Sequence, residues 1–369
     1  MNRLAGKFSI DKNKSFIISN LEHHANDLPW RARGRTVRLR VSQQGEIDPD
    51  ELDRVLEKEG KLARLVSVTG ASNVVGTIQP VKELTKVAHK HGVPIAIDAA
   101  QLGPHIPINM MGDDEETRID FLFLSGHKMY APFGGGVLVG PRDFFKRSAP
   151  TIRGGGAVLV VGEEGVDWSN PPDSEEAGSP NVIGAITLAA ASRELRNIGF
   201  DTLIEHEEML TKKLLTGLAD IDGARVFGLT KSSDSNRRLG VVSFNLKGIN
   251  DNLVATILSH EGGIGVRNGC FCAHPFVMQM LNISESTASG LRDKIRKGDR
   301  SEIPRAVRVS FGLYNTEDEV ERLLYMIRLI SEKKIETAYE QNSRSGHFYP
   351  VSGIPDYRSI IKELKSLNI

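Results

Sequence analysis

Short apolar runs alternate with amphipathic segments through the first two thirds of the chain, and this alternation constrains the fold more than any other feature. The runs at residues 93–98 (VPIAID) and 119–125 (IDFLFLS) contain too few polar residues for strands with one face in water. Strands buried on both faces are typical of parallel sheets covered by helices. We therefore predict an α/β fold with a three-layer αβα large domain built on a mainly parallel sheet.

The pattern changes at about residue 220, where shorter strand-like runs and two amphipathic helices predict a second unit. We expect a large domain over residues 1–215, a smaller C-terminal α/β domain over 216–335 and an extension over 336–369. The polar stretch 283–303 predicts a surface excursion. In the extension, a polar linker should precede a short amphipathic helix carrying Ile360, Ile361, Leu364 and Leu367.

Charge and cysteine content exclude several classes of protein. The 47 Lys and Arg residues balance the 47 Asp and Glu residues, so no overall field favours nucleic acid or an anionic membrane. The opening residues lack the apolar core of a signal peptide, and no stretch approaches 18 uncharged apolar residues, so we expect neither secretion nor a membrane span. Cys270 and Cys272 are too few for a disulfide framework, which favours a reducing, cytoplasmic compartment.

Several apolar runs lead directly into polar residues that can take part in chemistry. These residues are Asn73, Asp98, Gln101, Ser125, His127 and Lys128, together with the segment 22–26 (EHHAN). Ligands of open α/β sheets bind at the carboxyl ends of the strands. A buried aspartate and a nearby lysine would both have shifted pKa values unless each had a partner, so we expect a ligand between Asp98 and Lys128.

Pyridoxal 5'-phosphate suits such a site. Its aldehyde forms a Schiff base with a lysine, its pyridine nitrogen stays protonated beside a carboxylate, and its phosphate needs donors such as Ser and His. The strand ends supply a residue for each of these needs. We therefore take pyridoxal phosphate as the expected cofactor.

Six motifs in one order also resemble the class V aminotransferase family, and within it the cysteine desulfurases and selenocysteine lyases. The motifs are EHHAN, SNVVGT, IAIDAAQ, FLSGHKMYAPFG, EAGSPN and VRNGCFCAHP, within a match over residues 15–332. Only SGHK and IDAAQ are distinctive alone. The resemblance implies the fold type I of pyridoxal phosphate enzymes, a homodimer and an amino-acid substrate such as L-cysteine.

The resemblance also implies a role for each matching residue at the cofactor. Lys128 matches the Schiff-base lysine, and Asp98 matches the partner of the pyridinium nitrogen. Gln101 and Asn73 match donors near the ring hydroxyl. His23, chosen over its neighbour, matches the histidine that stacks on the ring and shuttles protons.

Phosphate contacts follow from the same resemblance. Ser125 and His127 match phosphate ligands. Ser179, in EAGSPN, matches a hydroxyl that reaches the phosphate of the other subunit in this family. Relatives commonly have Thr there, and Ser keeps the hydroxyl.

The substrate side rests on the second unit. Cys272 matches the nucleophile that takes the substrate sulfur as a persulfide, and Arg308 matches the arginine that clamps the substrate carboxylate. Arg267 is placed to hold that loop or to favour the thiolate. Cys270 is a second candidate nucleophile. Cys270, Cys272 and His274 could also be metal ligands, but a fourth ligand is not evident, and we expect no metal.

Two departures from the family bear on function. Relatives begin with a glycine and threonine turn that holds the phosphate, whereas this chain opens with MNRLAGKF, which resembles the end of the following helix. We expect weaker cofactor binding in a chain truncated at this point. The loop NGCFCA resembles that of molybdenum cofactor sulfurase domains, which leaves the sulfur acceptor open.

The sequence therefore predicts a cysteine desulfurase that converts L-cysteine to L-alanine. Selenocysteine remains a possible substrate. Another class V enzyme (an aminotransferase, epimerase or lyase) is the main alternative, and a catalytically impaired, dimer-forming relative is the third.

Overall fold

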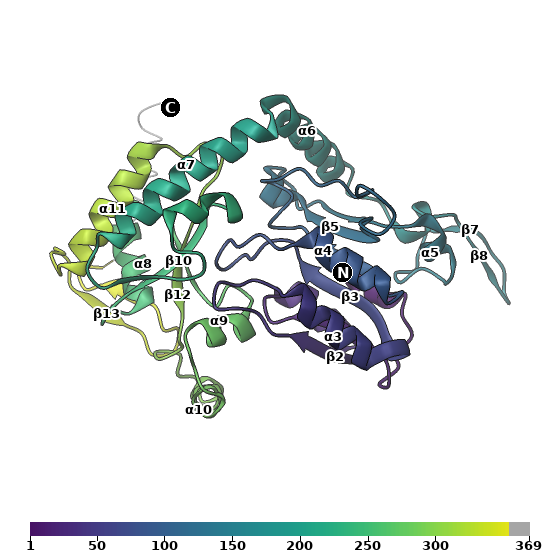
Figure 1. The fold of residues 1–369 in the computed structure, drawn as a ribbon, viewed down its shortest axis with the longest axis horizontal. Coiled ribbons are helices and arrows are strands. Elements are labelled where there is room, and N and C mark those ends of the chain that lie inside the picture. The colour runs from purple at the N-terminus through teal and green to yellow at the C-terminus, as the bar shows by residue number, and fades with distance from the viewer. Residues whose placement is uncertain (354–369) are drawn as a thin grey trace.

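A computed structural model describes residues 1–353 and shows two large sheets, each with its own core, and two two-stranded hairpins (Figure 1). The larger sheet has the strand order β2-β1-β3-β4-β5-β6. Its strands are β1 (Ser15–Ser19), β2 (Arg35–Leu39), β3 (Ala63–Thr69), β4 (Ile95–Asp98), β5 (Phe121–Ser125) and β6 (Gly136–Val139). Every neighbouring pair is parallel except β5 and β6. The predicted α/β fold with a mainly parallel sheet is confirmed.

Both faces of the large sheet are covered, which gives it three layers. Ile17 and Val66 point to a core shared with α3 (Pro49–Glu59) and α4 (Val81–Lys90). Their neighbours Phe16 and Leu65 point to the opposite face, into a core that includes Trp30 of α2 (Leu28–Arg31). Because successive side chains of a strand alternate between faces, strands buried on both faces must be apolar throughout.

Local sequence signals explain where the covering helices begin and end. The Asp48 side chain accepts a hydrogen bond from the backbone N–H of Asp50, so it caps α3. After α4, Gly92 has a φ of +67°, a conformation that favours glycine. Helices α6 (Val182–Ile198) and α7 (Phe200–Ala219) are separated by Gly199, which has a φ of +91°.

The smaller sheet is antiparallel and has the order β11-β12-β10-β9. Its strands are β9 (Ala224–Val226), β10 (Val241–Leu246), β11 (Arg267–Gly269) and β12 (Ala306–Ser310). Helices α8 (Asp251–His260) and α11 (Glu317–Ser331) pack on it, and α7 contributes Leu210 and Leu214 to the same core. Helix α7 thus leads from the large sheet into the second core (Figure 1).

Smaller elements complete the described chain. They are α1 (Asn2–Gly6), α5 (Arg142–Lys146), α9 (His274–Met280), α10 (Glu285–Arg296), β7 (Val158–Val161), β8 (Val166–Trp168), β13 (Tyr339–Gln341), β14 (Phe348–Pro350) and five short 3₁₀ helices, η1 (His24–Asn26), η2 (Gly60–Leu62), η3 (Gly126–Met129), η4 (Asp173–Glu175) and η5 (Ser232–Arg237). No helix of this described part is both long and apolar enough to cross a membrane.

Outside the two large sheets, the sequence did not predict the hairpin of β7 with β8 or that of β13 with β14. The polar excursion at 283–303 is largely α10, a surface helix that buries none of its residues. Within the expected polar linker, β13 and β14 form an antiparallel hairpin, because Tyr339 packs against the second core. The expected helix with Ile360 and Leu364 lies outside the described residues.

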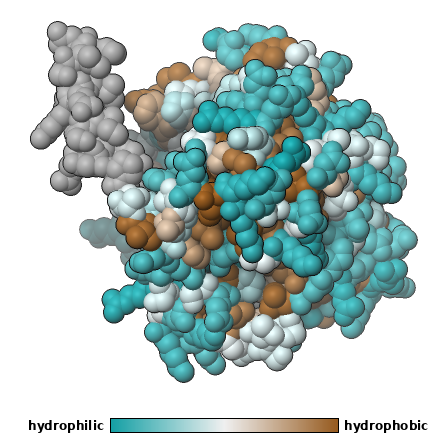
Figure 2. Space-filling view, turned by 90° about the vertical axis from the view of Figure 1, so that its left-hand side faces the viewer, coloured by the Kyte–Doolittle hydropathy of each residue, from teal (hydrophilic) through white to brown (hydrophobic). Residues whose placement is uncertain are grey.

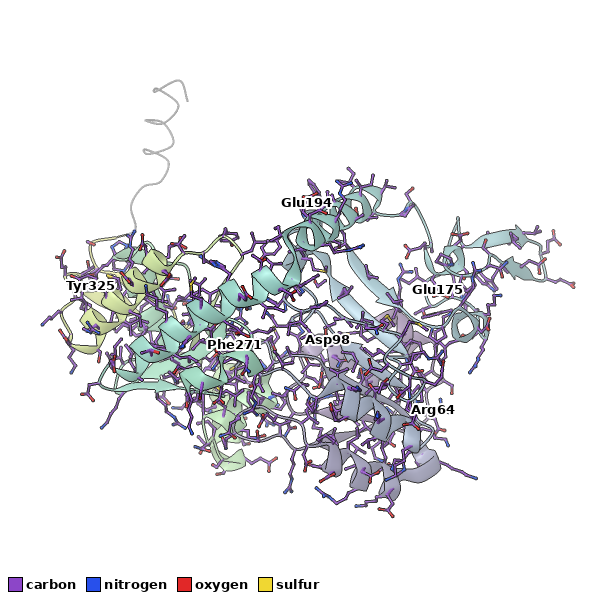
Figure 3. The ribbon with its side chains drawn as sticks, turned by 45° about the horizontal axis from the view of Figure 1, so that its top comes forward. Arg64, Asp98, Glu175, Glu194, Phe271 and Tyr325 are labelled. Atoms are coloured by element: carbon purple, nitrogen blue, oxygen red, sulfur yellow. The ribbon has the colours of Figure 1, made fainter. Side chains whose placement is uncertain are left out.

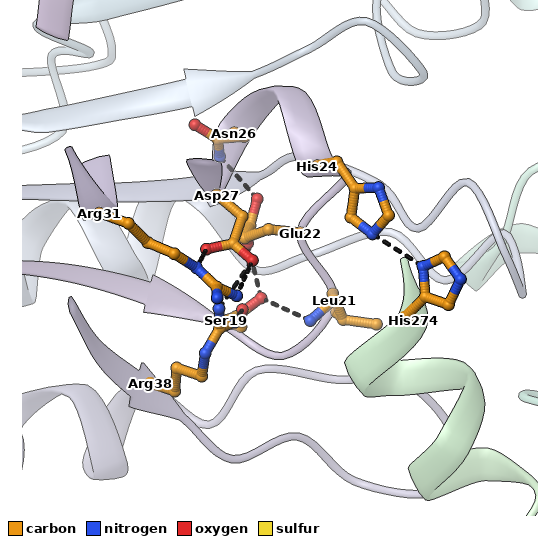
Figure 4. Close-up of polar contacts among 9 residues, drawn as sticks. All are labelled: Ser19, Leu21, Glu22, His24, Asn26, Asp27, Arg31, Arg38 and His274. Carbon is orange, nitrogen blue, oxygen red and sulfur yellow. Dashed lines mark hydrogen bonds and ion pairs between the residues drawn. The ribbon is translucent and has the colours of Figure 1, made fainter. Parts of the chain in front are cut away.

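A buried polar network fixes the segment that follows β1. The carboxyl oxygens of Glu22 accept hydrogen bonds from Ser19 Oγ (2.6 Å) and Asn26 Nδ2 (2.6 Å) (Figure 4). They also accept one from the backbone N–H of Thr69 (3.1 Å). Asn26 Oδ1 in turn accepts a hydrogen bond from Ser67 Oγ at 2.6 Å. The network therefore ties η1 to β1 and β3 at the carboxyl edge of the sheet.

Burial raises the pKa of Glu22 from 4.5 to about 8, against the lowering effect of these hydrogen bonds. The folded state thus binds a proton that the unfolded state releases between these two values, so stability is lost as the pH rises through this window. We expect the free energy of unfolding to fall between pH 5 and 8 by up to about 1.4 kcal/mol per pH unit from this group. Urea unfolding of Glu22→Gln should show a shallower pH slope than the wild type, with the exposed Glu57→Gln as control. Equal slopes for the wild type and Glu22→Gln would contradict the assignment.

Candidate active site

A cavity of about 1000 Å³ opens at the carboxyl edge of the large sheet and is also lined by residues of the smaller sheet. It brings together the residues predicted for the site, except Ser179 and the second candidate nucleophile, Cys270. These residues are His23, Asn73, Asp98, Gln101, Ser125, His127, Lys128, Arg267, Cys272 and Arg308. Asp98 and Phe271, another wall residue, lie toward the centre of the molecule (Figure 3).

Asp98 is the last residue of β4, in register with Thr69 of β3 and Phe123 of β5. This central position leaves its side chain only 5% exposed. The backbone N–H of Ala100 donates a hydrogen bond to its Oδ1 at 3.0 Å. Burial raises the pKa of Asp98, and the nearby ammonium of Lys128 acts in the opposite direction.

Lys128 lies in η3, which directly follows β5, and its Nζ donates a hydrogen bond to Gln101 Oε1 at 3.0 Å. Burial lowers the pKa of this amine, and so do the guanidinium groups of Arg308 and Arg267, whereas Asp98 raises it. Within residues 1–353, neither Lys128 nor Asp98 forms an ion pair. A half-buried amine with a lowered pKa is a better nucleophile at neutral pH than an ordinary lysine.

The predicted phosphate ligands are only partly brought together. Ser125 Oγ and His127 Nδ1 lie 3.1 Å apart on the cavity wall. Ser179 is exposed, in the segment before α6, and does not line the cavity. Ser179 is predicted to reach the phosphate bound by the other subunit. A single chain does not test this role, which stays a prediction.

The Cys272 loop has an unusual backbone. Phe271 and Cys272 have φ values of +51° and +57°, the left-handed region that non-glycine residues rarely adopt. Two hydrogen bonds hold the loop there: Asn73 Nδ2 donates to Phe271 O (2.8 Å), and the backbone N–H of His24 donates to Cys272 O (2.7 Å). Both donors belong to segments at the edge of the large sheet.

The two cysteines have different surroundings. Cys270 is buried, its Sγ contacts Pro304 O at 3.4 Å, and burial raises its pKa to about 11. Its thiolate is therefore scarce at neutral pH. Cys272 is partly exposed and lines the cavity. Of the two candidates, only Cys272 can meet a ligand in this cavity.

Arg308 lies on β12 in register with Arg267 of β11. Its Nη1 donates a hydrogen bond to Asn73 O (2.8 Å), and its guanidinium lies 5.1 Å from the centroid of the Phe271 ring. Its Nε is buried and has no hydrogen-bond partner among the described residues. Burial, with help from Arg267, lowers its pKa to about 10, so it stays cationic and has donor capacity left for an anion.

His23 precedes η1 and lines the same cavity. Its Nδ1 accepts a hydrogen bond from the backbone N–H of Ala25 at 3.1 Å. Burial lowers the pKa of His23, and the charges of Lys128 and Arg267 lower it further. The imidazole is thus mainly neutral at pH 7, and its Nδ1 is an acceptor.

Sequence reasoning missed Phe271 as the platform of Arg308 and missed the pairing of His24 with His274. No sequence signal marks the Phe271 contact, because it depends on the left-handed loop. His24 Nε2 and His274 Nδ1 lie 2.9 Å apart, although EHHAN and CAHP are far apart in sequence. Among residues 1–353, no three His, Cys, Asp or Glu side chains are grouped to hold a metal ion.

The sequence as a whole is similar to those of known proteins. The profile described as Aminotransferase class-V matches residues 1–323. A probable cysteine desulfurase of Halalkalibacterium halodurans is 33% identical over 323 residues, which are 86% of this chain and 71% of the relative. Another, from Staphylococcus aureus, is 33% identical over 89% of this chain and 72% of its own length.

Solved structures give the same result. The cysteine desulfurase CsdA of Escherichia coli superposes with a TM-score of 0.76 at 26% identity, covering 91% of this chain and 77% of that one. The cysteine desulfurase of Thermococcus onnurineus also has a TM-score of 0.76, at 31% identity over 90% of this chain and 76% of that one. Both the sequence profile and the fold lead to one conclusion: the chain is a member of the class V aminotransferase family.

Proposed function

We propose that the chain is a pyridoxal phosphate-dependent cysteine desulfurase that converts L-cysteine to L-alanine and keeps the sulfur as a persulfide on Cys272. The observation that carries the proposal is the single cavity in which Lys128, Asp98, Cys272 and Arg308 meet. Relatives named as probable cysteine desulfurases, at 33% identity, support the choice of reaction.

The residues of the cavity fit pyridoxal phosphate. Lys128 would hold its aldehyde, the buried Asp98 its pyridine nitrogen, and Ser125 with His127 its phosphate. Burial without an ion pair leaves both Asp98 and Lys128 with shifted pKa values, which a charged aromatic ligand would offset. When bound, the cofactor supplies an electron sink that weakens bonds at the α and β carbons of an amino acid.

The protein's own groups account for the remaining chemistry. Arg308 binds the substrate carboxylate through its guanidinium, whose Nε has no hydrogen-bond partner among residues 1–353. His23, neutral at pH 7, takes up or returns a proton. The Cys272 sulfur bonds to the substrate sulfur as the carbon–sulfur bond breaks; the bonding electrons stay on the β carbon, which is protonated to give alanine. An acceptor thiol then removes the sulfur.

We expect Lys128 to be the residue that fixes the cofactor. After addition of pyridoxal phosphate and borohydride reduction, peptide mass spectrometry should find the label on the peptide containing Lys128. Lys128→Ala should lose that label and all desulfurase activity, whereas the exposed Lys231→Ala should keep both. A wild-type chain labelled elsewhere, or not at all, would overturn the assignment and favour a relative without cofactor.

Cys272 should be essential and Cys270 should not. Cys272→Ser should lower alanine release from L-cysteine by at least about 100-fold, as loss of a nucleophile does, yet keep cofactor binding. Cys270→Ser should retain most activity, because Cys270 is buried away from the cavity. The serine hydroxyl can still donate the hydrogen bond to Pro304 O that the thiol makes. Unchanged turnover in Cys272→Ser would favour another class V reaction, such as transamination.

The same proposal includes a homodimer. Leu159, Val160 and Val161 of β7 are 61–68% exposed, and Ile183 and Ile186 of α6 are 61% and 63% exposed. In Figure 1 the β7–β8 hairpin protrudes at one end of the molecule, and α6 lies along its top edge, nearer the middle. The face that Figure 2 shows, at the other end, is mostly hydrophilic with scattered apolar residues. A second copy would cover these exposed apolar side chains and could bring Ser179 to the partner's site.

Charge on the apolar hairpin should therefore break the dimer. We expect Leu159→Asp with Val161→Asp to give a monomer in light scattering at micromolar concentration, since both side chains would lose water in the interface. Tyr325→Ser is the matched control, because Tyr325 is 59% exposed but lies on α11 at the far end (Figure 3). A wild-type monomer would contradict this part of the proposal.

A further inference from the structure

The imidazoles of His24 and His274 form a contact between the two segments that supply His23 and Cys272 to the cavity. His274 Nδ1 lies 2.9 Å from His24 Nε2, and the ring planes differ by only 3° (Figure 4). His24 begins η1, next to His23, whereas His274 begins α9, two residues after Cys272. The contact joins segments that are 250 residues apart in the chain.

A second bond runs beside the first. The backbone N–H of His24 donates to Cys272 O at 2.7 Å, so η1 holds the Cys272 loop at both Cys272 and His274. The loop needs such support, because the left-handed backbone of Phe271 and Cys272 is unfavourable in isolation. On its other side, Asn73 Nδ2 donates a hydrogen bond to Phe271 O.

We propose that His24 and His274 are positioning residues that hold the Cys272 thiol toward the cavity. The hydrogen bond between their imidazoles, called the latch below, breaks when both imidazoles are protonated. An imidazole pair shares one hydrogen bond while at least one ring keeps a nitrogen lone pair. Two imidazolium rings have only donors and repel each other. The inference takes from the proposed function only the role of Cys272.

The charges around the pair set where it titrates. Burial lowers the pKa of His24, His23 and Arg31 lower it further, and Asp27 raises it. Asp27 already forms ion pairs with Arg31 (2.6 Å) and Arg38 (2.7 Å) (Figure 4). These guanidinium groups offset its negative charge, which limits how far Asp27 raises the pKa of His24. Burial and His24 likewise lower the pKa of His274. The latch is therefore closed at neutral pH and opens on the acid side of the usual histidine range.

Hydrogen exchange of the full chain without cofactor or cysteine tests the latch independently of desulfurase activity. Rates of the peptide covering 270–276 are corrected for intrinsic exchange at pH 5 and 7. We expect the wild type to lose about tenfold protection at pH 5, the worth of one hydrogen bond. His274→Ala should lack this protection at both pH values.

His274→Asn is the deciding variant, because its amide occupies the position of Nδ1 and can bind His24 Nε2 without taking up a proton. It should restore protection at pH 7 and keep it at pH 5. His206→Asn, which changes a histidine that contacts Asn315 O, is the control and should behave as wild type. Equal wild-type protection at both pH values, or an acid loss in His274→Asn as large as in wild type, would overturn the proposal.

Discussion

The site depends on two opposite charges that the fold desolvates but does not pair. Asp98 is fixed at the end of a central strand between Thr69 and Phe123, and Lys128 follows the next strand. An isolated buried charge is costly, and an ion pair would be the simplest way to reduce that cost. In the described part of the chain both groups instead line one cavity without an ion pair, which preserves them for a ligand that contacts both.

The smaller sheet supplies the rest of the site, and Asn73 at the edge of the large sheet positions it. Asn73, just after β3, accepts a hydrogen bond from Arg308 of β12 through its carbonyl and donates one to the Phe271 carbonyl through its side chain. One residue of the large sheet therefore positions both the carboxylate-binding arginine and the cysteine loop. Because Arg308 also lies over the Phe271 ring, the three residues behave as one unit, and a change in one should shift the others.

Much of this was predictable from the sequence, and the exceptions have a common cause. The residues of β4 and β5 are almost all apolar, so these strands must be buried on both faces, as in a parallel sheet. The parallel sheet and the positions of Asp98 and Lys128 at its strand ends therefore follow from local sequence. The resemblance added Cys272 and Arg308, which no periodicity identifies. The roles of Phe271, Glu22 and His274 depend on backbone geometry or on contacts between distant segments. The hairpin of β7 and β8 was missed because its exposed valines satisfy no pattern of burial.

The positive φ of Phe271 restricts how this loop can drift during evolution. Glycine would suit the backbone best but would remove the ring beneath Arg308. Valine or isoleucine would be nearly incompatible with the left-handed conformation. An aromatic residue, which has no branch at Cβ, tolerates the positive φ and also supplies a ring beneath Arg308. We therefore expect orthologues that keep this arginine to have an aromatic side chain at the position of Phe271.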